Sequence, residues 1–370
     1  MRIGIITLPL HANYGGILQA YALQTTLERM GHEVKVIEQR RKKRRIPLAK
    51  VPYVIARRTL AKYIKRKNIR IFDEHYYNTN FPIWCTNTGK FIKKHIHRDI
   101  VDSFNDIKED DFDAYVVGSD QVWRPSYFNT MLGSVEIPFL GFTNEWNVKR
   151  IAYAASFSVD NWEYNNLDGQ RAKDLAQKFD AVSVREDSGV GLCKRYLNVD
   201  AKHVLDPTML LDAADYLKLL DNMVAKPSNG DIFTYILNED ETKLKVIEDA
   251  EQRFNLKRFS VGADFGLIEV QPPVEQWLQA FKDAKLVITD SFHGTVFSIL
   301  FHKPFIVLGN KARGNSRIES LLKTFDLQGH LYNSNGDLRA IATSNLDVVN
   351  LANTLDTLRK DSLKVFDCLK

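Results

Sequence analysis

Apolar and polar positions change periodicity several times along the chain, and the first changes predict a β-α-β unit. The apolar run 3–8 is typical of a buried strand, and residues 17–30 carry apolar side chains at helical spacing up to Gly31. Another apolar run, 34–37, follows directly. A strand, a helix and a second strand in this order favour a parallel sheet with helices on its faces.

The same alternation continues to the end of the chain. Further strands are predicted at 114–117, 150–155, 181–184, 232–237, 258–261, 286–289 and 305–308. Further helices are predicted at 242–254, 274–281, 296–301 and 346–369. A break at Asp206-Pro207-Thr208 separates two groups of strands, and 370 residues suit two α/β domains. We therefore predict one domain at 1–205, a second at 206–345 with a cleft between them, and a helix at 346–370 that packs back on the first.

Small and polar residues follow several of the predicted strands. In open parallel sheets, ligands bind beyond the carboxyl ends of the strands. Such ends include Asn13–Gly16, Gly118–Trp123 and Ser156. The turn at Gly15-Gly16 lacks the full G-x-G-x-x-G pattern, so it does not indicate a tightly held nucleotide diphosphate. Each of these segments also has a purely structural interpretation, as a permissive turn or a helix cap.

Arg185 ends a predicted strand of small and apolar residues. We expect its guanidinium to emerge at the cleft, where Arg geometry suits bidentate binding of a carboxylate or phosphate. An ion pair with Glu186 or Asp187 is the alternative. A basic loop farther along, from Lys311 to Arg317, is a second candidate for an anion.

His293 follows the strand at 286–289 and precedes Gly294, a small neighbour that would allow close substrate approach. An imidazole can exchange protons near neutral pH, and Asp290 and Ser291 are near enough in the chain to orient the ring. We therefore predict that His293 is a proton-transfer group, although an isolated histidine is often structural.

Composition excludes several classes of protein. No apolar run reaches the roughly 18 residues of a membrane helix, so we expect a cytoplasmic protein. The three cysteines and nine histidines form no metal-ligand pattern, and neither a nucleophile elbow nor a kinase motif occurs. We predict no metal and no cofactor.

The basic segment 40–70 changes this picture, because it holds 14 Lys or Arg residues and no acid. Two interpretations fit it equally well: a solvated helical face, and a patch that binds an anionic partner. We predict no nucleic-acid partner and keep peripheral contact with the inner face of the membrane, or with a lipid-linked phosphate, as the functional alternative.

The combined motifs resemble the polysaccharide pyruvyl transferase family. They occur in family order, at Asn13-Tyr14-Gly15-Gly16, Gly118-Ser119-Asp120-Gln121-Val122-Trp123, Tyr153-Ala154-Ala155-Ser156, Ser183-Val184-Arg185-Glu186, Asp206-Pro207-Thr208 and Asp290-Ser291-Phe292-His293-Gly294. The resemblance implies two Rossmann-like domains similar to those of GT-B glycosyltransferases. It also implies phosphoenolpyruvate as co-substrate. The implied acceptor is a sugar, on a glycan or on its lipid-linked precursor, whose two hydroxyls become part of a pyruvate ketal.

The resemblance also implies roles for individual residues. His293 and Asp120 become the catalytic candidates. The donor-binding candidates are Arg185, Ser291, Gly294, Lys311 and Arg317. The acceptor-binding candidates are Asn13, Gly15, Gly16, Ser119, Gln121, Trp123 and Ser156. Many relatives read Arg-Leu-His where this chain has Ser291-Phe292-His293. Either Ser291 and nearby backbone N–H groups, aided by the loop from Lys311 to Arg317, replace that arginine, or the donor is not phosphoenolpyruvate.

Two other hypotheses remain open at this point. The first keeps the GT-B fold and makes the chain a glycosyltransferase that uses a nucleotide sugar. The second makes it a binding or scaffold protein anchored through residues 40–70.

Overall fold

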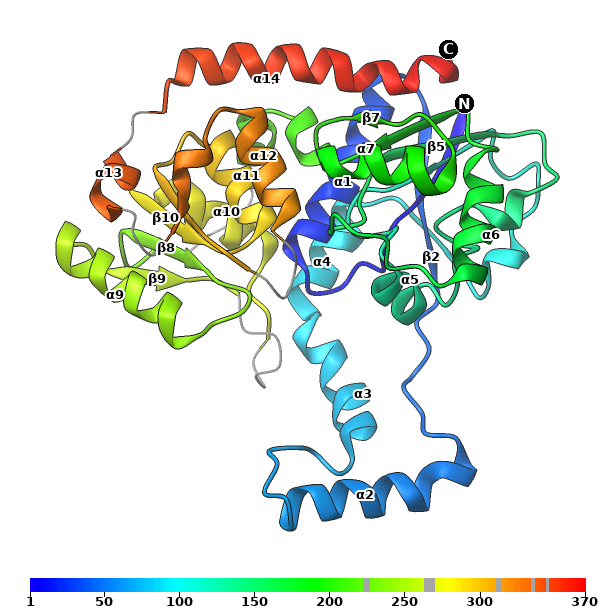
Figure 1. Ribbon diagram of the computed structural model, residues 1–370, viewed down its shortest axis with the longest axis horizontal. Helices are drawn as coiled ribbons and strands as arrows, with labels where there is room; N and C mark the ends of the chain where they lie inside the picture. The colour runs from blue at the N-terminus through cyan, green and yellow to red at the C-terminus, as the bar shows by residue number, and fades with distance from the viewer. Residues whose placement is uncertain (222–226, 263–269, 311–314, 334–336, 344–345) are drawn as a thin grey trace.

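The computed structural model describes residues 1–221, 227–262, 270–310, 315–333, 337–343 and 346–370. Two α/β domains lie side by side, and the C-terminal helix α14 (Val348–Leu363) runs across both of them (Figure 1). An arm made of α2 (Val51–Tyr63) and α3 (Asp73–Trp84) projects on the opposite side. The molecule therefore consists of two sheet domains, a helix that bridges them and an arm.

The first sheet has seven parallel strands in the order β3-β2-β1-β4-β5-β6-β7. The strands are β1 Arg2–Ile6, β2 Glu33–Gln39, β3 Arg98–Val101, β4 Ala114–Val117, β5 Lys149–Ala155, β6 Ala181–Val184 and β7 Lys202–His203. Successive strands are added on one side of β1 up to β3 and on its other side from β4, so the strand order reverses between β1 and β4. This is the Rossmann arrangement, in which ligands bind where the strand order reverses.

The second sheet has five parallel strands in the order β12-β11-β10-β8-β9. The strands are β8 Ile232–Tyr235, β9 Arg258–Ser260, β10 Leu286–Thr289, β11 Phe305–Leu308 and β12 Leu331–Tyr332. The strand order reverses between β8 and β10. Each domain therefore has one such switch point.

Helices cover both faces of each sheet. Besides α2, α3 and α14, they are α1 Tyr14–Arg29, α4 Thr86–His95, α5 Pro125–Met131, α6 Asn166–Ala176, α7 Asp187–Leu192, α8 Ala213–Lys218, α9 Glu241–Phe254, α10 Val274–Asp283, α11 Phe292–Leu300, α12 Ser316–Thr324 and α13 Leu338–Thr343. Two short 3-10 helices also matter below: η5 (Pro207–Leu210) and η7 (Lys364–Leu369).

The predicted strands agree with the structure more closely than the predicted helix starts. β4, β6, β10 and β11 have the predicted bounds. The short strands β3, β7 and β12 were not predicted, because they are partly or fully exposed and carry no apolar run. Two helices begin earlier than expected. α1 begins at Tyr14 instead of residue 17, and α11 begins at Phe292 instead of residue 296.

One apolar core runs from the first domain into the second. It contains side chains of α1 together with aromatic residues of the second domain. Tyr14 stacks on Trp277 at 5.5 Å between ring centroids and donates a hydrogen bond to the carbonyl oxygen of Pro272 at 2.8 Å. The N-terminal end of α1 is therefore packed against the second domain.

The C-terminal segment lies against the first domain. Phe366, fully buried, stacks on Tyr153 of β5 with 4.8 Å between ring centroids. The backbone N–H of Leu205 donates to the hydroxyl of Ser362 at 3.0 Å. The chain thus returns to the first sheet after it has built the second.

Phe366→Ala tests how far the first domain depends on this segment. We expect the free energy of unfolding of that domain to fall by about 3–5 kcal/mol, because the substitution empties a fully buried aromatic site. Urea denaturation followed by intrinsic fluorescence measures the change. Val349→Ala, at an α14 position that is 71% exposed, is the control and should change stability by less than about 0.5 kcal/mol. Equal unfolding midpoints for the two variants would contradict the expectation.

Candidate active site between the two domains

The two switch points face each other across the interface. α1 leaves the carboxyl end of β1, and His293 lies in the first turn of α11 after β10. A Cβ atom built on Gly15 would lie only 2.1 Å from Nδ1 of His293. The glycine therefore lets the backbone of the first domain touch the imidazole of the second.

Asp206 lies at the centre of the charged groups between the domains. Its Oδ2 is 2.8 Å from Nη1 of Arg185 and 3.7 Å from Nε2 of His293, and it accepts from the Ser119 hydroxyl at 3.3 Å. Its Oδ1 accepts from the backbone N–H of Thr208 at 3.0 Å, which caps η5. Burial would raise the pKa of Asp206, but His293 and Arg185 hold that pKa well below its usual range. The carboxylate is ionised and tied to both domains.

Arg185 and Arg317 come together over one aromatic ring. The guanidinium carbon of Arg185 lies 4.5 Å from the centroid of Phe292, and that of Arg317 lies 5.7 Å from it. Both side chains are buried. Burial and the neighbouring Arg185 lower the pKa of Arg317 to about 10, so it stays protonated at neutral pH. Two buried cations on one ring form a place suited to an anion.

Asp120 lies beside these arginines. Its Oδ1 accepts from Nη2 of Arg185 at 3.2 Å and lies 3.9 Å from Nη1 of Arg317. Burial would raise its pKa, but Arg185, His293 and Arg317 outweigh burial and lower it. A carboxylate with a lowered pKa is a weak base. Its position fits a counter-charge and hydrogen-bond acceptor better than a group that removes a proton.

Several buried polar atoms of the site have no hydrogen-bond partner within the described part of the chain. They are Nε of Arg185, Nε2 of His293, Oε1 of Gln121 and Oε2 of Glu186. The 3.7 Å between His293 and Asp206 is within ion-pair range but longer than a hydrogen bond. Buried donors and acceptors are normally satisfied, so these atoms are candidates for contact with bound substrate.

His11 is a second imidazole near the site. Burial and the nearby Arg41 lower its pKa, whereas Asp120 acts in the opposite direction. Nδ1 lies 2.7 Å from the backbone N–H of Ala12, which donates to it. In this arrangement the neutral ring carries its proton on Nε2.

The expectation that Asp290 orients His293 is wrong, and Ser291 and Gly294 have structural contacts beside their predicted contact with the donor, which stays a prediction. Asp290 does not orient the imidazole: its carboxylate accepts from the backbone N–H groups of Leu237 and Asn238 and from Lys243 Nζ. The hydroxyl of Ser291 accepts from the N–H of Gly294 at 3.3 Å and caps α11. Gly294 is small because a Cβ there would lie 2.2 Å from Oγ1 of Thr289. These residues hold α11 in place, and Asp206 takes the orienting role.

Three predicted acceptor-binding residues lie in the core of the first domain. Trp123 is fully buried, stacks on Phe139 at 4.9 Å and donates its indole N–H to the carbonyl oxygen of Pro138. Ser119 and Ser156 are also fully buried. A sugar could not reach these side chains, so their predicted contact with an acceptor does not fit the structure.

The acceptor candidates in the segment 13–16 lie where the first domain meets the second. Asn13 and Gly16 are partly exposed at the start of α1. Gly15 is buried against His293, so its contribution is the close approach described above. Lys311 lies outside the described residues.

Sequence reasoning missed Asp206, Phe292 and His11 as site residues. Asp206 was noted as part of a break between domains and of a family motif, but it was given no role in the site, and its spacing from Arg185 gave no sign that the two meet. Phe292 looks like an ordinary core aromatic beside His293. His11 follows β1 in the same strand-end position as the other candidates, and that position is the one signal that could have found it.

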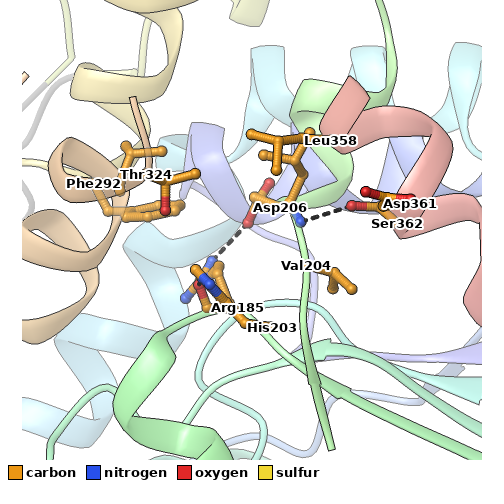
Figure 2. A pocket seen from close by; sticks show the side chains of 11 residues that line it. Arg185, His203, Val204, Asp206, Phe292, Thr324, Leu358, Asp361 and Ser362 are labelled. Carbon is orange, nitrogen blue, oxygen red and sulfur yellow. Dashed lines mark hydrogen bonds and ion pairs between the residues drawn. The ribbon is translucent and has the colours of Figure 1, made fainter. Parts of the chain in front are cut away.

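A small cavity of about 50 Å³ lies behind Arg185 (Figure 2). Phe292 and Thr324 line it on the side of the second domain, and Leu358 and Ser362 of α14 line it on the other. This volume holds a few water molecules and excludes a sugar. The cavity separates the C-terminal helix from the ion pair and is not the substrate site.

Among the described residues, no group of three or more His, Cys, Asp or Glu side chains is arranged to hold a metal ion. A search of the described helices for one long and apolar enough to span a membrane also finds none.

The two parallel sheets with facing switch points define a two-domain α/β fold of the GT-B type. The chain is similar to the crystal structure of Arabidopsis thaliana UGT89C1 complexed with UDP-L-rhamnose, with a TM-score of 0.52, 10% identity and coverage of 100% of this chain and 97% of that one. It is also similar to UDP-GlcNAc 2-epimerase from Neisseria meningitidis bound to UDP-GlcNAc, with a TM-score of 0.48, 9% identity and coverage of 98% and 94%. At these identities the likeness concerns the fold alone.

The model of the family described as polysaccharide pyruvyl transferase matches residues 13–312. The chain belongs to this family. A comparison with curated protein sequences finds no match.

Gly15→Ala tests the contact between the domains. We expect the added methyl group to displace the His293 imidazole and to lower transferase turnover by about 100-fold, the lower end of what a positioned proton-transfer group contributes. The loss of turnover should not be explained by unfolding, so the variant should remain folded at the assay temperature. Gly16→Ala is the matched control, because the nearest atom to its Cβ, Nδ2 of Asn13, is 3.4 Å away. Similar activities for the two variants would rule out this role for Gly15.

Proposed function

We propose that this polysaccharide pyruvyl transferase moves a pyruvyl group from phosphoenolpyruvate to two hydroxyls of one sugar and forms a pyruvate ketal. The sugar belongs to a cell-surface polysaccharide or to its lipid-linked precursor. One observation carries the proposal: a chain of this family brings His293 together with two buried arginines at the facing switch points.

The reaction balances without a metal or a redox partner. A proton added to the methylene carbon of phosphoenolpyruvate makes a methyl group, and the neighbouring carbon then accepts the oxygen of the first sugar hydroxyl. The C–O bond to phosphate breaks, and the second hydroxyl attacks the same carbon. One hydroxyl proton restores the proton that the acid gave to the methylene carbon, and the other leaves with phosphate.

The donor carries a carboxylate and a phosphate, and both need cations or N–H donors. Arg185 is tied to Asp206 and Asp120 through its two terminal nitrogens, which leaves Nε for a ligand. Arg317 lies on the same aromatic ring. We assign Nε of Arg185 and the guanidinium of Arg317 to the anionic groups of the donor; the planar Arg317 group suits a bidentate contact.

His293 is assigned the proton transfers. Asp206 lies 3.7 Å from its Nε2, and that nitrogen has no hydrogen-bond partner in the described chain, so it can meet a bound substrate. Asp120 is assigned to the acceptor, where its ionised carboxylate accepts a hydrogen bond from a sugar hydroxyl. Gln121, whose buried Oε1 has no partner in the described chain, is assigned to a second hydroxyl.

His293→Asn and Arg317→Lys separate chemistry from donor binding. We expect His293→Asn to lower turnover by about 10²–10⁴-fold with little change in the dissociation constant of phosphoenolpyruvate. Arg317→Lys should weaken phosphoenolpyruvate binding by about tenfold or more, because a lysine cannot form the bidentate contact. Calorimetric titration gives the dissociation constant, and phosphate release with a panel of lipid-linked sugars gives turnover.

Two exposed positions supply the controls. His302 has a left-handed backbone, with φ of 52°, which asparagine also adopts readily, so His302→Asn should leave both quantities unchanged. Arg253→Lys replaces an exposed arginine of α9. Thermal stabilisation of the wild-type protein by a nucleotide sugar, without stabilisation by phosphoenolpyruvate, would favour a glycosyltransferase and overturn the proposal.

A further inference from the structure

The arm formed by residues 40–84 stands outside both domain cores. No residue of α2 or α3 is buried, although both helices are well formed. Figure 1 shows α2 at the far end of the arm, away from the two sheets. Burial against the protein therefore does not explain the apolar side chains of this arm.

The arm nevertheless has a defined internal structure. Arg58 forms two hydrogen bonds with the Glu74 carboxylate, at 2.7 and 2.8 Å. The guanidinium of Arg44 lies 3.3 Å from the ring centroid of Tyr77, and that of Arg41 lies 3.4 Å from the centroid of Phe81. These contacts attach the basic segment and α2 to α3.

The side of α2 that faces solvent is apolar. Tyr53, Leu60 and Ile64 fall within an arc of about 40° at 100° per residue, and Tyr63 flanks them. These four side chains are 67%, 47%, 71% and 68% exposed, and Leu48, just before the helix, is 90% exposed. The opposite side of α2, toward the rest of the arm, is the partly buried one. A helix whose apolar stripe points into water marks an interaction surface.

Positive charge lies close to this stripe. Residues 40–70 contain 14 Lys or Arg and no acid. Exposed Arg57 lies at the edge of the stripe, about 40° from Tyr53 at 100° per residue, and exposed Lys62 and Lys65 precede and follow Tyr63 and Ile64 in the sequence. Long basic side chains beside Tyr, Leu and Ile are the composition of a helix that lies in the interface of an anionic bilayer. Nucleic acids would use the cations but would gain little from exposed aliphatic groups.

The base of the arm contacts both domains. Phe81 packs edge-on against His11, with ring centroids 6.0 Å apart. At the end of α3, the carbonyl oxygen of Trp84 accepts from the backbone N–H of Gln271 in the second domain, at 3.0 Å. α3 thus connects a surface bound by α2 to the interface between the domains.

We infer that the arm docks the enzyme on an anionic phospholipid surface, with Tyr53, Leu60, Tyr63 and Ile64 inserted among the lipids and the basic side chains on their phosphate groups. Docking of this kind holds the site near the membrane, at the distance set by α3. If the proposed function holds, this is where a lipid-linked sugar acceptor would be presented. The docking itself does not depend on the transferase reaction.

Vesicle sedimentation of the full chain tests the inference. The probes are vesicles of phosphatidylcholine alone and of an equal mixture with phosphatidylglycerol. We expect binding to the mixed vesicles, weakened by added salt, and little binding to phosphatidylcholine alone. Lys62→Gln/Lys65→Gln should weaken binding by about thirtyfold, because each cation near an anionic surface contributes roughly fivefold. Leu60→Ser/Ile64→Ser should weaken it by about tenfold or more.

Matched variants separate the arm from general effects of charge and apolarity. Lys245→Gln/Lys360→Gln removes two exposed cations elsewhere, and Leu167→Ser/Val349→Ser removes two exposed apolar side chains, which are 85% and 71% exposed. Both should bind like the wild type. Equal binding to the two kinds of vesicle would overturn the inference. Two other results would also overturn it, if vesicles stay unbound. One is self-association that requires Leu60 and Ile64, and the other is binding to random-sequence RNA that requires them.

Discussion

The buried ion pair between Arg185 and Asp206 is the interaction on which the site depends. Burying a guanidinium and a carboxylate is costly unless each is paired and hydrogen-bonded. Arg185 directly follows β6, and Asp206 begins the link to the second domain. The same carboxylate faces His293 of α11. One pair therefore fixes the end of a strand, the domain link and the imidazole of the other domain.

The interface between the domains is part of the site and also part of the core. Tyr14 is packed on Trp277, and the next residue, Gly15, lies against His293. Apolar packing thus sets the distance at which the charged groups meet. Behind them, Ser362 receives the N–H of Leu205, the residue before Asp206. The C-terminal segment supports the ion pair from outside, so stability and site geometry share the same contacts.

The arm follows a different physical logic from the rest of the molecule. Its helices are held by ion pairs and by cations stacked on aromatic rings, and its apolar stripe points into solvent. An apolar face costs free energy in water and is retained where something else covers it. The arm meets the enzyme domains at α3, which connects the inferred docking surface to His11 beside the site.

Local sequence determined the strands and the strand-end positions, because period and strand-ending residues are properties of a few neighbours. β4, β6, β10 and β11 were predicted to the residue, and His293, Arg185 and Asp120 were identified as candidates. Tertiary structure decided how these residues are used. Ser291 and Gly294 hold α11, Trp123 belongs to the core, and Asp206 orients His293 in place of Asp290. No local pattern brings Asp206 to Arg185 and His293, because their meeting depends on how two sheets pack across a shared core.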